Sequence, residues 1–489
     1  MSRLAPCVMV VGTASSVGKS VVATALCRVL REEGLRVAPF KAQNMSLNAA
    51  VTPAGEEIGR AQAAQADAAG VPPSALMNPI LLKPESDSRS QLVVLGRARG
   101  TVAARDYWRE REDLWPIVRD ALRDLRREYD AIVIEGAGSA AEINLRRTDV
   151  ANMRVAVAAR AATLLVADIE RGGVFAQIHG TLTLMRRSEV ALVKGVLVNK
   201  FRGDPTLFSG GVARIRRLTG VPVLGVLPYA EDLGVPPEDS LSLDDVPKSG
   251  ALDVAVMRYP HTSNFDDFTP LAEAGATVRY VRAPNELGVP DLVVLPGSKT
   301  TIDDLEWLRA SGLGAQLLRL VDAGVPVIGI CGGFQMLGRE LSDPAGVEGA
   351  PRVVRGLGLL PIRTTFTTKK LTVRVRGNLS SGAPFEGYEM HVGDTDRDGS
   401  APFAQIERDD LLVADGAVSE DGRVTGTYVH GLFANAAVRD ELLARLARRR
   451  GISFTPRALP ADRYAALSTW FREAVDVRRL MRVTRVGRG

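Results

Sequence analysis

A glycine-bounded segment near the N-terminus constrains the fold more than any other feature of this chain. It runs from Gly12 to Ser20, reads GTASSVGKS, follows the apolar run 7–11 and precedes a helix-forming stretch. Glycines let backbone N–H groups converge on phosphate oxygens at a helix N-terminus, the lysine supplies a mobile cation, and the serine hydroxyl is a Mg²⁺ ligand. The segment therefore predicts a phosphate-binding loop, in which the residues expected to hold a nucleotide are Gly12, Thr13, Val17, Gly18, Lys19 and Ser20.

The first 230 residues have the rhythm of a parallel sheet covered by helices. Short apolar runs alternate with segments of helical period. A polar stretch with several prolines, from Gly234 to Gly250, ends this series. We therefore expect an α/β, doubly wound P-loop domain over residues 1–240, with strands at 7–11, 131–134, 163–167, 194–198 and 223–226.

A second alternating series follows this stretch. After it comes a region of strands and turns up to about residue 430, and residues 435–489 have a helical pattern. We expect a flavodoxin-like α/β domain over 251–445 and a helical, basic C-terminal segment over 446–489. The arginines of that segment have no aromatic residues between them, which favours a solvated tail over a nucleic-acid site. The strands of the second domain are expected near 252–257, 292–295 and 325–330.

Polar side chains follow three strands of the first domain, at the edge where doubly wound folds bind ligands. Glu135 ends the run AIVIE, Asp168 ends TLLVAD, and Asn199 follows VLV. Glu135, Asp168 and the hydroxyl of Ser20 are candidate Mg²⁺ ligands, because Mg²⁺ prefers oxygen. The amide of Asn199 is suited to reading an adenine edge. The alternative for each carboxylate is a helix cap, and for Asn199 a polar turn.

The second motif is a cysteine between a buried strand and a helix. The run VPVIGI leads straight into Cys331, two glycines follow, and FQMLGREL then has a helical pattern. Glycines on both sides permit the sharp turn that exposes a nucleophile, and a helix N-terminus stabilises a thiolate. Cys331 is therefore predicted to be a nucleophile. The backbone N–H groups of Gly297, which ends another strand, and of Gly332 are candidates for an oxyanion hole.

A thiol nucleophile needs a base, and the chain contains four histidines. His430 ends the short run TYV about 100 residues beyond the cysteine, a separation that tertiary folding can close. His391, in GYEMHVG, is the competitor. We expect His430 to be the base.

Composition excludes several classes of protein. The chain has 489 residues, of which 46% are hydrophobic and 24% charged, so it suits two or three globular domains. No apolar run reaches the roughly 18 residues of a membrane span, and the N-terminus shows no cleavable signal. Three cysteines cannot form a disulfide framework. These features predict a cytoplasmic protein with no membrane or nucleic-acid partner.

Beyond single motifs, the chain resembles a known family over essentially its whole length. The GTxxxVGKS form of the loop is similar to that of dethiobiotin synthetase and its relatives, and the second half resembles the class I glutamine amidotransferases. Their fusion is similar to the cobyric acid synthases of cobalamin biosynthesis. The stretches that carry this resemblance are KAQNMSLN (41–48), EIGRAQ (57–62), MNPILLKP (77–84) and EINL (142–145).

The resemblance implies ATP- and Mg²⁺-dependent amidation of the b, d, e and g carboxylates of adenosylcobyrinic acid a,c-diamide, with glutamine as nitrogen donor. It implies that Cys331 forms a glutamyl thioester and that His430 moves the proton. It also places Asp149, in RTDVAN, near the amidation site, where a helix cap is the alternative. Ordinary triad amidotransferases carry a glutamate two residues after the histidine; this chain has Leu432 there, so another group would orient the base.

Three other interpretations stay open. Cobyrinic acid a,c-diamide synthases share both domains but amidate two other carboxylates, and the stretches 41–48 and 77–84 argue against them. A P-loop positioning ATPase with an inert second domain, or an ammonia-dependent ligase with a decayed glutaminase, leaves the intact cysteine motif unexplained.

The sequence is compatible with a homo-oligomer. It also leaves open the role of Glu170, which stands where the family more often has aspartate.

Overall fold

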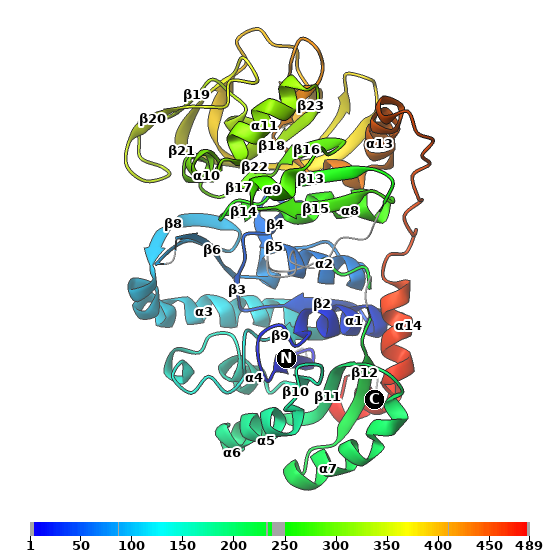
Figure 1. The fold of residues 1–489 in the computed structure, drawn as a ribbon. Helices are drawn as coiled ribbons and strands as arrows, with labels where there is room; N and C mark the ends of the chain where they lie inside the picture. Colours follow the sequence, from blue (N-terminus) through cyan, green and yellow to red (C-terminus); the bar gives the residue numbers. More distant parts are fainter. Residues whose placement is uncertain (1–3, 87, 231–232, 237–249, 409, 487–489) are drawn as a thin grey trace.

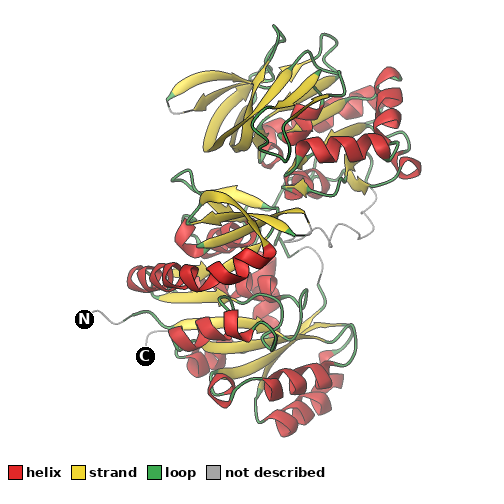
Figure 2. Ribbon diagram, turned by 90° about the vertical axis from the view of Figure 1, so that its left-hand side faces the viewer, coloured by secondary structure: helices red, strands yellow, loops and turns green. Residues whose placement is uncertain are grey.

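The chain folds into two stacked α/β halves, seen one above the other in Figure 1 and from the side in Figure 2. The boundary expected between Gly234 and Gly250 falls largely on residues 237–249, which lie outside the described residues. We call the lower part in Figure 1 the first half and the upper part the second half. The computed structural model describes residues 4–86, 88–230, 233–236, 250–408 and 410–486.

The first half is built on a parallel six-stranded sheet in the order β12-β11-β10-β1-β9-β2. Side chains of β1 alternate between two apolar cores, since Val8 and Val10 pack on one face and Met9 and Val11 on the other. Helices cover both faces, which confirms a doubly wound domain. The strands are β1 (Cys7–Gly12), β2 (Val37–Phe40), β9 (Ala131–Glu135), β10 (Ala162–Asp168), β11 (Val193–Phe201) and β12 (Val223–Pro228).

A region between β2 and β9 was not predicted as sheet. It forms a four-stranded sheet, β3-β6-β7-β8, and a hairpin of β4 and β5, which lie between the large sheet and the second half (Figure 1). The strands are β3 (Gln43–Met45), β4 (Ala49–Val51), β5 (Glu57–Gly59), β6 (Ile80–Ser86), β7 (Arg89–Val94) and β8 (Arg97–Ala103). The helices of this half are α1 (Lys19–Glu32), α2 (Arg60–Ala69), α3 (Ala104–Glu128), α4 (Met153–Ala159), α5 (Val174–Leu184), α6 (Arg187–Val190) and α7 (Ser209–Thr219).

The second half has a central sheet in the order β15-β13-β16-β18-β26-β25, parallel except for β25. Its strands are β13 (Asp253–Met257), β15 (Thr277–Val281), β16 (Leu292–Leu295), β18 (Val327–Ile330), β25 (Ala417–Val418) and β26 (Val424–Thr427). Its helices are α8 (Thr269–Glu273), α9 (Pro284–Leu287), α10 (Thr301–Ala310), α11 (Leu313–Asp322), α12 (Gly332–Met336) and α13 (Ala436–Arg450).

A second, mainly antiparallel sheet lies beside the central sheet. It forms in the region where strands and turns were expected. It is dominated by the long hairpin of β21 (Arg363–Leu379) and β22 (Pro384–Asp396). The strand β22 also pairs with β27 (Val429–His430), so this sheet reaches the predicted base. The remaining strands are β19 (Glu340–Asp343), β20 (Arg352–Arg355), β23 (Ala404–Arg408) and β24 (Leu411–Asp415), with the short pair β14 (Thr262–Ser263) and β17 (Gly297–Ser298) nearby.

After α13 the chain returns to the first half, where α14 (Ala465–Ala474) and α15 (Val477–Thr484) pack (Figure 1). Leu467, Trp470 and Phe471 enter the same apolar core as Leu26 and Leu30 of α1. The arginines of α15 are exposed, as expected of a solvated face. The apolar face of this segment is nevertheless docked, so the C-terminal residues complete the core of the first half rather than forming a free tail.

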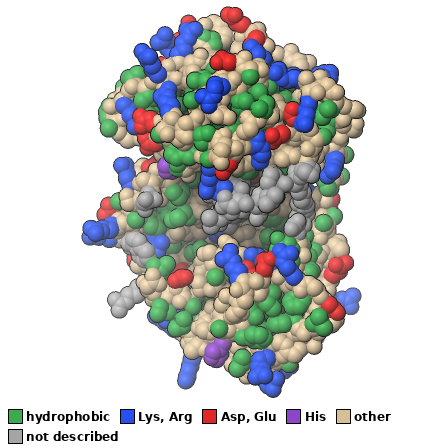
Figure 3. Space-filling model, in the orientation of Figure 1, with side chains coloured by type: hydrophobic (Ala, Val, Ile, Leu, Met, Phe, Trp, Pro, Cys, Tyr) green, Lys and Arg blue, Asp and Glu red, His purple; other side chains and the backbone are tan. Residues whose placement is uncertain are grey.

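Among the described residues, no helix combines the length and the apolar character needed to cross a membrane. On the face shown in Figure 3, Lys and Arg side chains are scattered over both halves and interspersed with Asp and Glu. Among the described residues on this face, the basic side chains form no continuous stripe.

The docked C-terminal helix generates a prediction about stability. Phe471 is fully buried, so Phe471→Ala should lower the free energy of unfolding by about 3–5 kcal/mol through lost apolar contacts and a cavity. Leu207→Ala is the control, because Leu207 is 82% exposed and should change stability by less than about 0.5 kcal/mol. Urea denaturation followed by circular dichroism measures both. Equal losses in the two variants would contradict the docking of α14.

Candidate active sites

The predicted phosphate loop joins β1 to α1 at the carboxyl edge of the parallel sheet. Gly18 has a φ of 101°, a conformation that strongly favours glycine, and directly precedes the helix. Lys19 Nζ donates to the carbonyl oxygens of Ala14 at 3.0 Å and Gly138 at 2.9 Å. The lysine ammonium therefore bridges the loop and the segment after β9, where it can meet phosphate oxygens.

A network of polar groups surrounds the carboxylate of Glu135, at the end of β9. Ser20 Oγ donates to Glu135 Oε1 at 2.8 Å, and Lys41 Nζ donates to the same oxygen at 2.9 Å. Gln65 Nε2 donates to Oε2 at 2.5 Å. A hydroxyl and a carboxylate thus converge beside the loop. This donor set fits Mg²⁺, which commonly takes one or two protein oxygens and completes its shell with phosphates and water.

Two other predicted residues of this edge make different contacts. Asp168 Oδ2 accepts from Lys200 Nζ at 2.9 Å, and its Oδ1 accepts the backbone N–H of Glu170 at 2.8 Å. Asn199 Nδ2 donates to Val17 O at 2.8 Å and so supports the phosphate loop. Their roles toward metal and adenine stay predictions.

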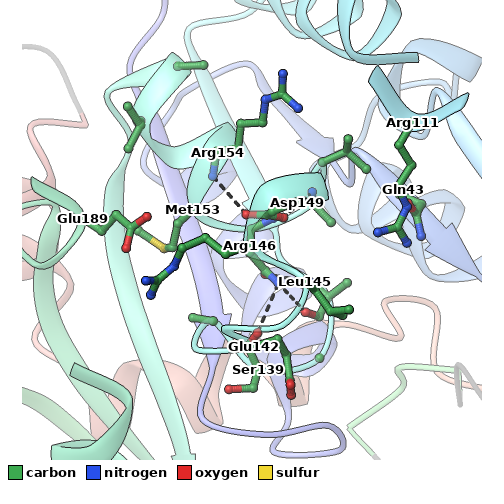
Figure 4. A pocket seen from close by; sticks show the side chains of 18 of the residues that line it. Gln43, Arg111, Ser139, Glu142, Leu145, Arg146, Asp149, Met153, Arg154 and Glu189 are labelled. Carbon is green, nitrogen blue, oxygen red and sulfur yellow. Dashed lines mark hydrogen bonds between the residues drawn. The ribbon is translucent and has the colours of Figure 1, made fainter. Parts of the chain in front are cut away.

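A cavity of about 700 Å³, shown from close by in Figure 4, is lined in part by Gly138, whose carbonyl oxygen accepts a hydrogen bond from Lys19 of the phosphate loop. Its wall combines apolar side chains, among them Trp115 and Met153, with guanidinium and carboxylate groups. Figure 4 shows Arg111, Arg146 and Asp149 around this space. The charged residues that line it are Arg111, Glu142, Arg146, Asp149, Arg154, Arg186 and Glu189. The cavity therefore suits a ligand with both apolar and anionic parts.

Asp149 organises the turn that leads into α4. Its Oδ1 accepts the backbone N–H of Ala151 at 2.9 Å and of Asn152 at 2.8 Å, and its Oδ2 accepts that of Arg154 at 3.1 Å (Figure 4). These are capping contacts, the alternative considered for this residue. Because Asp149 also lines the cavity, the structure places a capping carboxylate at the wall of a candidate ligand site.

Cys331 occupies the predicted sharp turn between β18 and α12. Its φ is 53°, in the left-handed region that non-glycine residues rarely enter. Such strain persists only where the surroundings hold it, and here the backbone N–H of Cys331 donates to Thr427 O at 2.8 Å on the neighbouring strand. The geometry is that of a nucleophile elbow.

His430, the predicted base, lies beside Cys331 and is oriented by an acid that the sequence analysis missed. Its Nδ1 lies 2.7 Å from Oδ2 of Asp267, and Asp267 Oδ1 accepts the backbone N–H of Gly431 at 2.9 Å. Burial lowers the pKa of His430, but the Asp267 carboxylate and the hydrogen bond to Cys331 outweigh it and raise the pKa to about 10. Cysteine, histidine and aspartate therefore form a triad.

One signal could have pointed to Asp267. The polar sequence HTSNFDD follows the strand 253–257 closely, at the same edge position that identified Glu135. Asp267 lies in the one-turn helix Phe265–Phe268 at that edge.

The two predicted oxyanion glycines also lie at this turn. A Cβ atom on Gly332 would stand 2.9 Å from the backbone nitrogen of Ser298, and one on Gly297 would stand 3.0 Å from Cε1 of His430. The loop that follows β16 therefore touches both the elbow and the base. Only glycines allow this approach, and the role of their backbone N–H groups as an oxyanion hole stays a prediction.

His391, the competing base, lies in the wall of the same pocket but in a different environment. Its ring stacks on Tyr428 with 3.7 Å between centroids, and its Nε2 is 3.9 Å from Glu389 Oε1, beyond hydrogen-bond distance. Neither ring nitrogen has a hydrogen-bond partner among the described residues. In the part of the chain that the structure describes, no carboxylate lies within hydrogen-bond distance of this imidazole, whereas Asp267 lies within that distance of His430.

The pocket beside Cys331 is a small space of about 60 Å³ that both halves line. Lys83 and Gln91 come from the first half, whereas the triad comes from the second. Its remaining described lining residues are Ser263, Asn264, Ser298, Lys299, Thr301, Gln335, Glu348, Lys370, Met390, His391 and Val392. This volume is far below the 700 Å³ of the cavity that Gly138 lines, so the pocket beside Cys331 admits only a small ligand.

Direct contacts between the halves reach the loop that carries the triad's acid. Asn264 Oδ1 accepts the backbone N–H of Ala49 at 3.2 Å, and Arg60 Nε lies 2.5 Å from Asp266 Oδ2. Residues of the first half thus contact Asn264 and Asp266, which lie in the loop just before Asp267.

Comparison with known proteins agrees with this division of the chain. Residues 8–243 match the CobQ/CobB/MinD/ParA nucleotide-binding domain, and residues 253–438 match the CobB/CobQ-like glutamine amidotransferase domain. The first match contains the phosphate loop and Glu135, and the second contains Cys331, Asp267 and His430.

Curated relatives match almost from end to end. The cobyric acid synthase of Chloroflexus aurantiacus is 48% identical over 472 residues, covering 94% of this chain and 96% of the relative. That of Chloroflexus aggregans is 49% identical over 472 residues, with the same coverage of both chains. That of Moorella thermoacetica is 48% identical over 471 residues, covering 93% of this chain and 91% of the relative.

The triad generates a prediction that separates the two histidines. Asp267→Asn and His430→Ala should each lower glutamine hydrolysis by about 10²- to 10⁴-fold, because the first loses the acid that fixes the imidazole and the second loses the base. His391→Ala is the matched control and should act mainly on KM. Ammonia release with glutamine alone measures all three. If His391→Ala caused the large loss and His430→Ala did not, the assignment would be reversed.

Proposed function

The chain belongs to the cobyric acid synthases, and we propose that it amidates the b, d, e and g carboxylates of adenosylcobyrinic acid a,c-diamide, using ATP and glutamine. One observation carries the proposal: a cysteine-histidine-aspartate triad and a phosphate-binding loop occupy opposite halves of a chain whose relatives match along its whole length. The first half would activate the carboxylate and the second would release ammonia.

Ammonia release would follow the geometry of the triad. Because the pKa of His430 is raised to about 10, the imidazole would already hold the thiol proton of Cys331 before the attack. Cys331 Sγ, as the thiolate, would attack the side-chain carbonyl carbon of glutamine, and His430 would pass the proton to the departing nitrogen, so that the C–N bond breaks and ammonia leaves. The N–H groups of Gly297 and Gly332 would stabilise the oxyanion. Water then attacks the glutamyl thioester, the C–S bond breaks, and glutamate and the thiol are regenerated.

Activation of the carboxylate would take place at the phosphate loop. A substrate carboxylate oxygen attacks the γ-phosphorus of ATP, which gives an acyl phosphate and ADP; ammonia then attacks the acyl carbon, and phosphate and a proton leave. Lys19 and the loop N–H groups would hold the phosphates. Ser20 and Glu135 would hold Mg²⁺, which supplies charge neutralisation when bound.

The 700 Å³ cavity is the proposed binding site of the corrinoid. Its apolar side chains, such as Trp115 and Met153, suit the macrocycle, and arginines such as Arg146 suit its peripheral carboxylates. The cavity lies beside Gly138, whose carbonyl accepts a hydrogen bond from Lys19. A carboxylate bound there would therefore be close to the phosphate loop.

A single assay tests the activity and the role of Cys331. Incubation of the protein with ATP, glutamine and adenosylcobyrinic acid a,c-diamide should add four amides, counted by mass spectrometry. Cys331→Ala should abolish amidation from glutamine while ammonium salts still support it, because the amidation site is separate. Amidation of cobyrinic acid at a and c instead would identify an a,c-diamide synthase, and turnover of glutamine by Cys331→Ala would remove the cysteine from the mechanism.

Asp149 provides a second test, on the amidation side. Asp149→Asn keeps an oxygen acceptor for the turn but removes the negative charge at the cavity wall. If the carboxylate acts near the reacting groups, amidation should slow or stop at partly amidated products, while melting temperature and glutaminase rate stay near those of the wild type. Normal amidation in Asp149→Asn, together with a lower melting temperature in Asp149→Ala, would show that Asp149 acts only as a helix cap.

A further inference from the structure

Asp415 is a buried carboxylate that the proposed mechanism does not use. It ends β24 and is only 3% exposed. Burial raises its pKa to about 7, and the hydrogen bond from the Thr427 hydroxyl offsets this only in part. Since burying a carboxylate costs free energy, its presence in the core is explained only by the contacts that it makes.

The Asp415 carboxylate binds the segment that leads to the base. Its Oδ1 accepts the backbone N–H of Tyr428 at 3.2 Å, and its Oδ2 accepts the hydroxyl of Thr427. The oxygen of the same hydroxyl accepts the backbone N–H of Val429 at 3.0 Å. Directly or through this hydroxyl, Asp415 therefore holds the three consecutive residues that precede His430.

This segment crosses from one sheet of the second half to the other. Thr427 ends β26 in the central sheet, whereas β27 pairs with β22 in the antiparallel sheet. The chain after Asp415 makes the same crossing, from β24 to β25. The two crossings lie close together, because a Cβ atom on Gly416 would stand 2.1 Å from the carbonyl oxygen of Gly426. Asp415 thus ties two segments together at the junction of the sheets.

The same crossing holds the nucleophile. The backbone N–H of Cys331 donates to Thr427 O at 2.8 Å, and this contact supports the strained φ of 53° at the elbow. His430 follows Thr427 by three residues. One short stretch of backbone therefore carries both the carbonyl that holds the cysteine and the imidazole of the base, so a shift of the crossing would change the distance between thiol and imidazole.

We propose that Asp415 is a positioning residue, which sets the relative position of Cys331 and His430 by fixing the crossing between the two sheets. It acts through the backbone and the hydroxyl of residues 427–429 rather than on the substrate. This inference rests on the roles of Cys331 and His430 in the proposed function. The alternative is that Asp415 only stabilises the fold.

Kinetic constants for glutamine hydrolysis give the first test. Asp415→Ala removes both acceptors, so kcat should fall by about 10- to 10²-fold, the scale expected when reacting groups are displaced by about 1 Å. The KM should stay within a few-fold, since Asp415 is not among the described residues that line the pocket. Asp415→Asn keeps an oxygen for the N–H of Tyr428 and an amide for the oxygen of Thr427, so it should restore most of the lost kcat. Ammonia release with glutamine alone measures these constants.

The reactivity of the thiol separates positioning from stability. The imidazolium of His430 stabilises the thiolate of Cys331, so alkylation of Cys331 by iodoacetamide, followed by mass spectrometry, should persist below the ordinary pKa of a thiol. Asp415→Ala should move the midpoint of this pH profile upward, whereas Asp415→Asn should leave it near that of the wild type. Thr427→Val removes the hydroxyl between Asp415 and Val429 and should move the midpoint in the same direction. Combined with Asp415→Ala it should add little, because the two changes break one network.

Controls separate this inference from a loss of stability and from the proposed function. Asp253→Ala removes a carboxylate of β13 that binds Arg279 at 2.7 Å, and should lower the melting temperature without changing kcat or the pH profile. Amidation supported by ammonium salts should be unchanged in Asp415→Ala, since the amidation site is separate. A wild type that does not hydrolyse glutamine would refute the proposed function itself.

Three results would overturn only the role of Asp415. The first is a wild-type kcat and pH profile in Asp415→Ala. The second is a loss in Asp415→Asn as large as that in Asp415→Ala. The third is an unchanged pH profile in Thr427→Val, which decides the question even if Asp415→Ala fails to fold.

Discussion

The buried hydrogen bond between His430 and Asp267 is the interaction on which the second half's chemistry depends. It joins residues 163 positions apart and fixes the imidazole beside Cys331. The loop that supplies Asp267 is itself bound by the first half, through the backbone of Ala49 and the ion pair of Arg60 with Asp266. The orientation of the base therefore depends on contacts with the first half. A displacement of the two halves would disturb the contact between Asp267 and His430 first, and the position of Cys331 only afterwards.

Both candidate sites lie at the carboxyl edges of parallel sheets, for one physical reason. At that edge the strand is followed by a helix N-terminus, whose free N–H groups attract phosphate, a thiolate or an oxyanion. The phosphate loop follows β1, and Cys331 follows β18. The insertion of β3 to β8 brings Lys83 to the edge of the second half, so the pocket beside the cysteine is closed by residues of both.

The two motifs were predictable because each is made of consecutive residues whose glycines and flanking apolar runs dictate the backbone. The phosphate loop, the elbow at Cys331 and the identity of the sheets follow from such local patterns. Asp267 could not be assigned in this way, because nothing near His430 in the sequence marks its partner. Strands β3, β4 and β5 are three residues each, too short for a periodic pattern to reveal. The helical character of the C-terminal segment was readable, but the surface that it covers depends on tertiary packing.

The return of the chain to the first half makes the glutaminase an inserted domain. The core around α1 is completed by Leu467, Trp470 and Phe471, which are synthesised after the whole second half. During translation the first half must therefore wait, with part of its apolar surface uncovered, until the last residues emerge from the ribosome. A gene cut between the halves would yield a first half that lacks part of its own core, so the two activities cannot be separated by simple truncation.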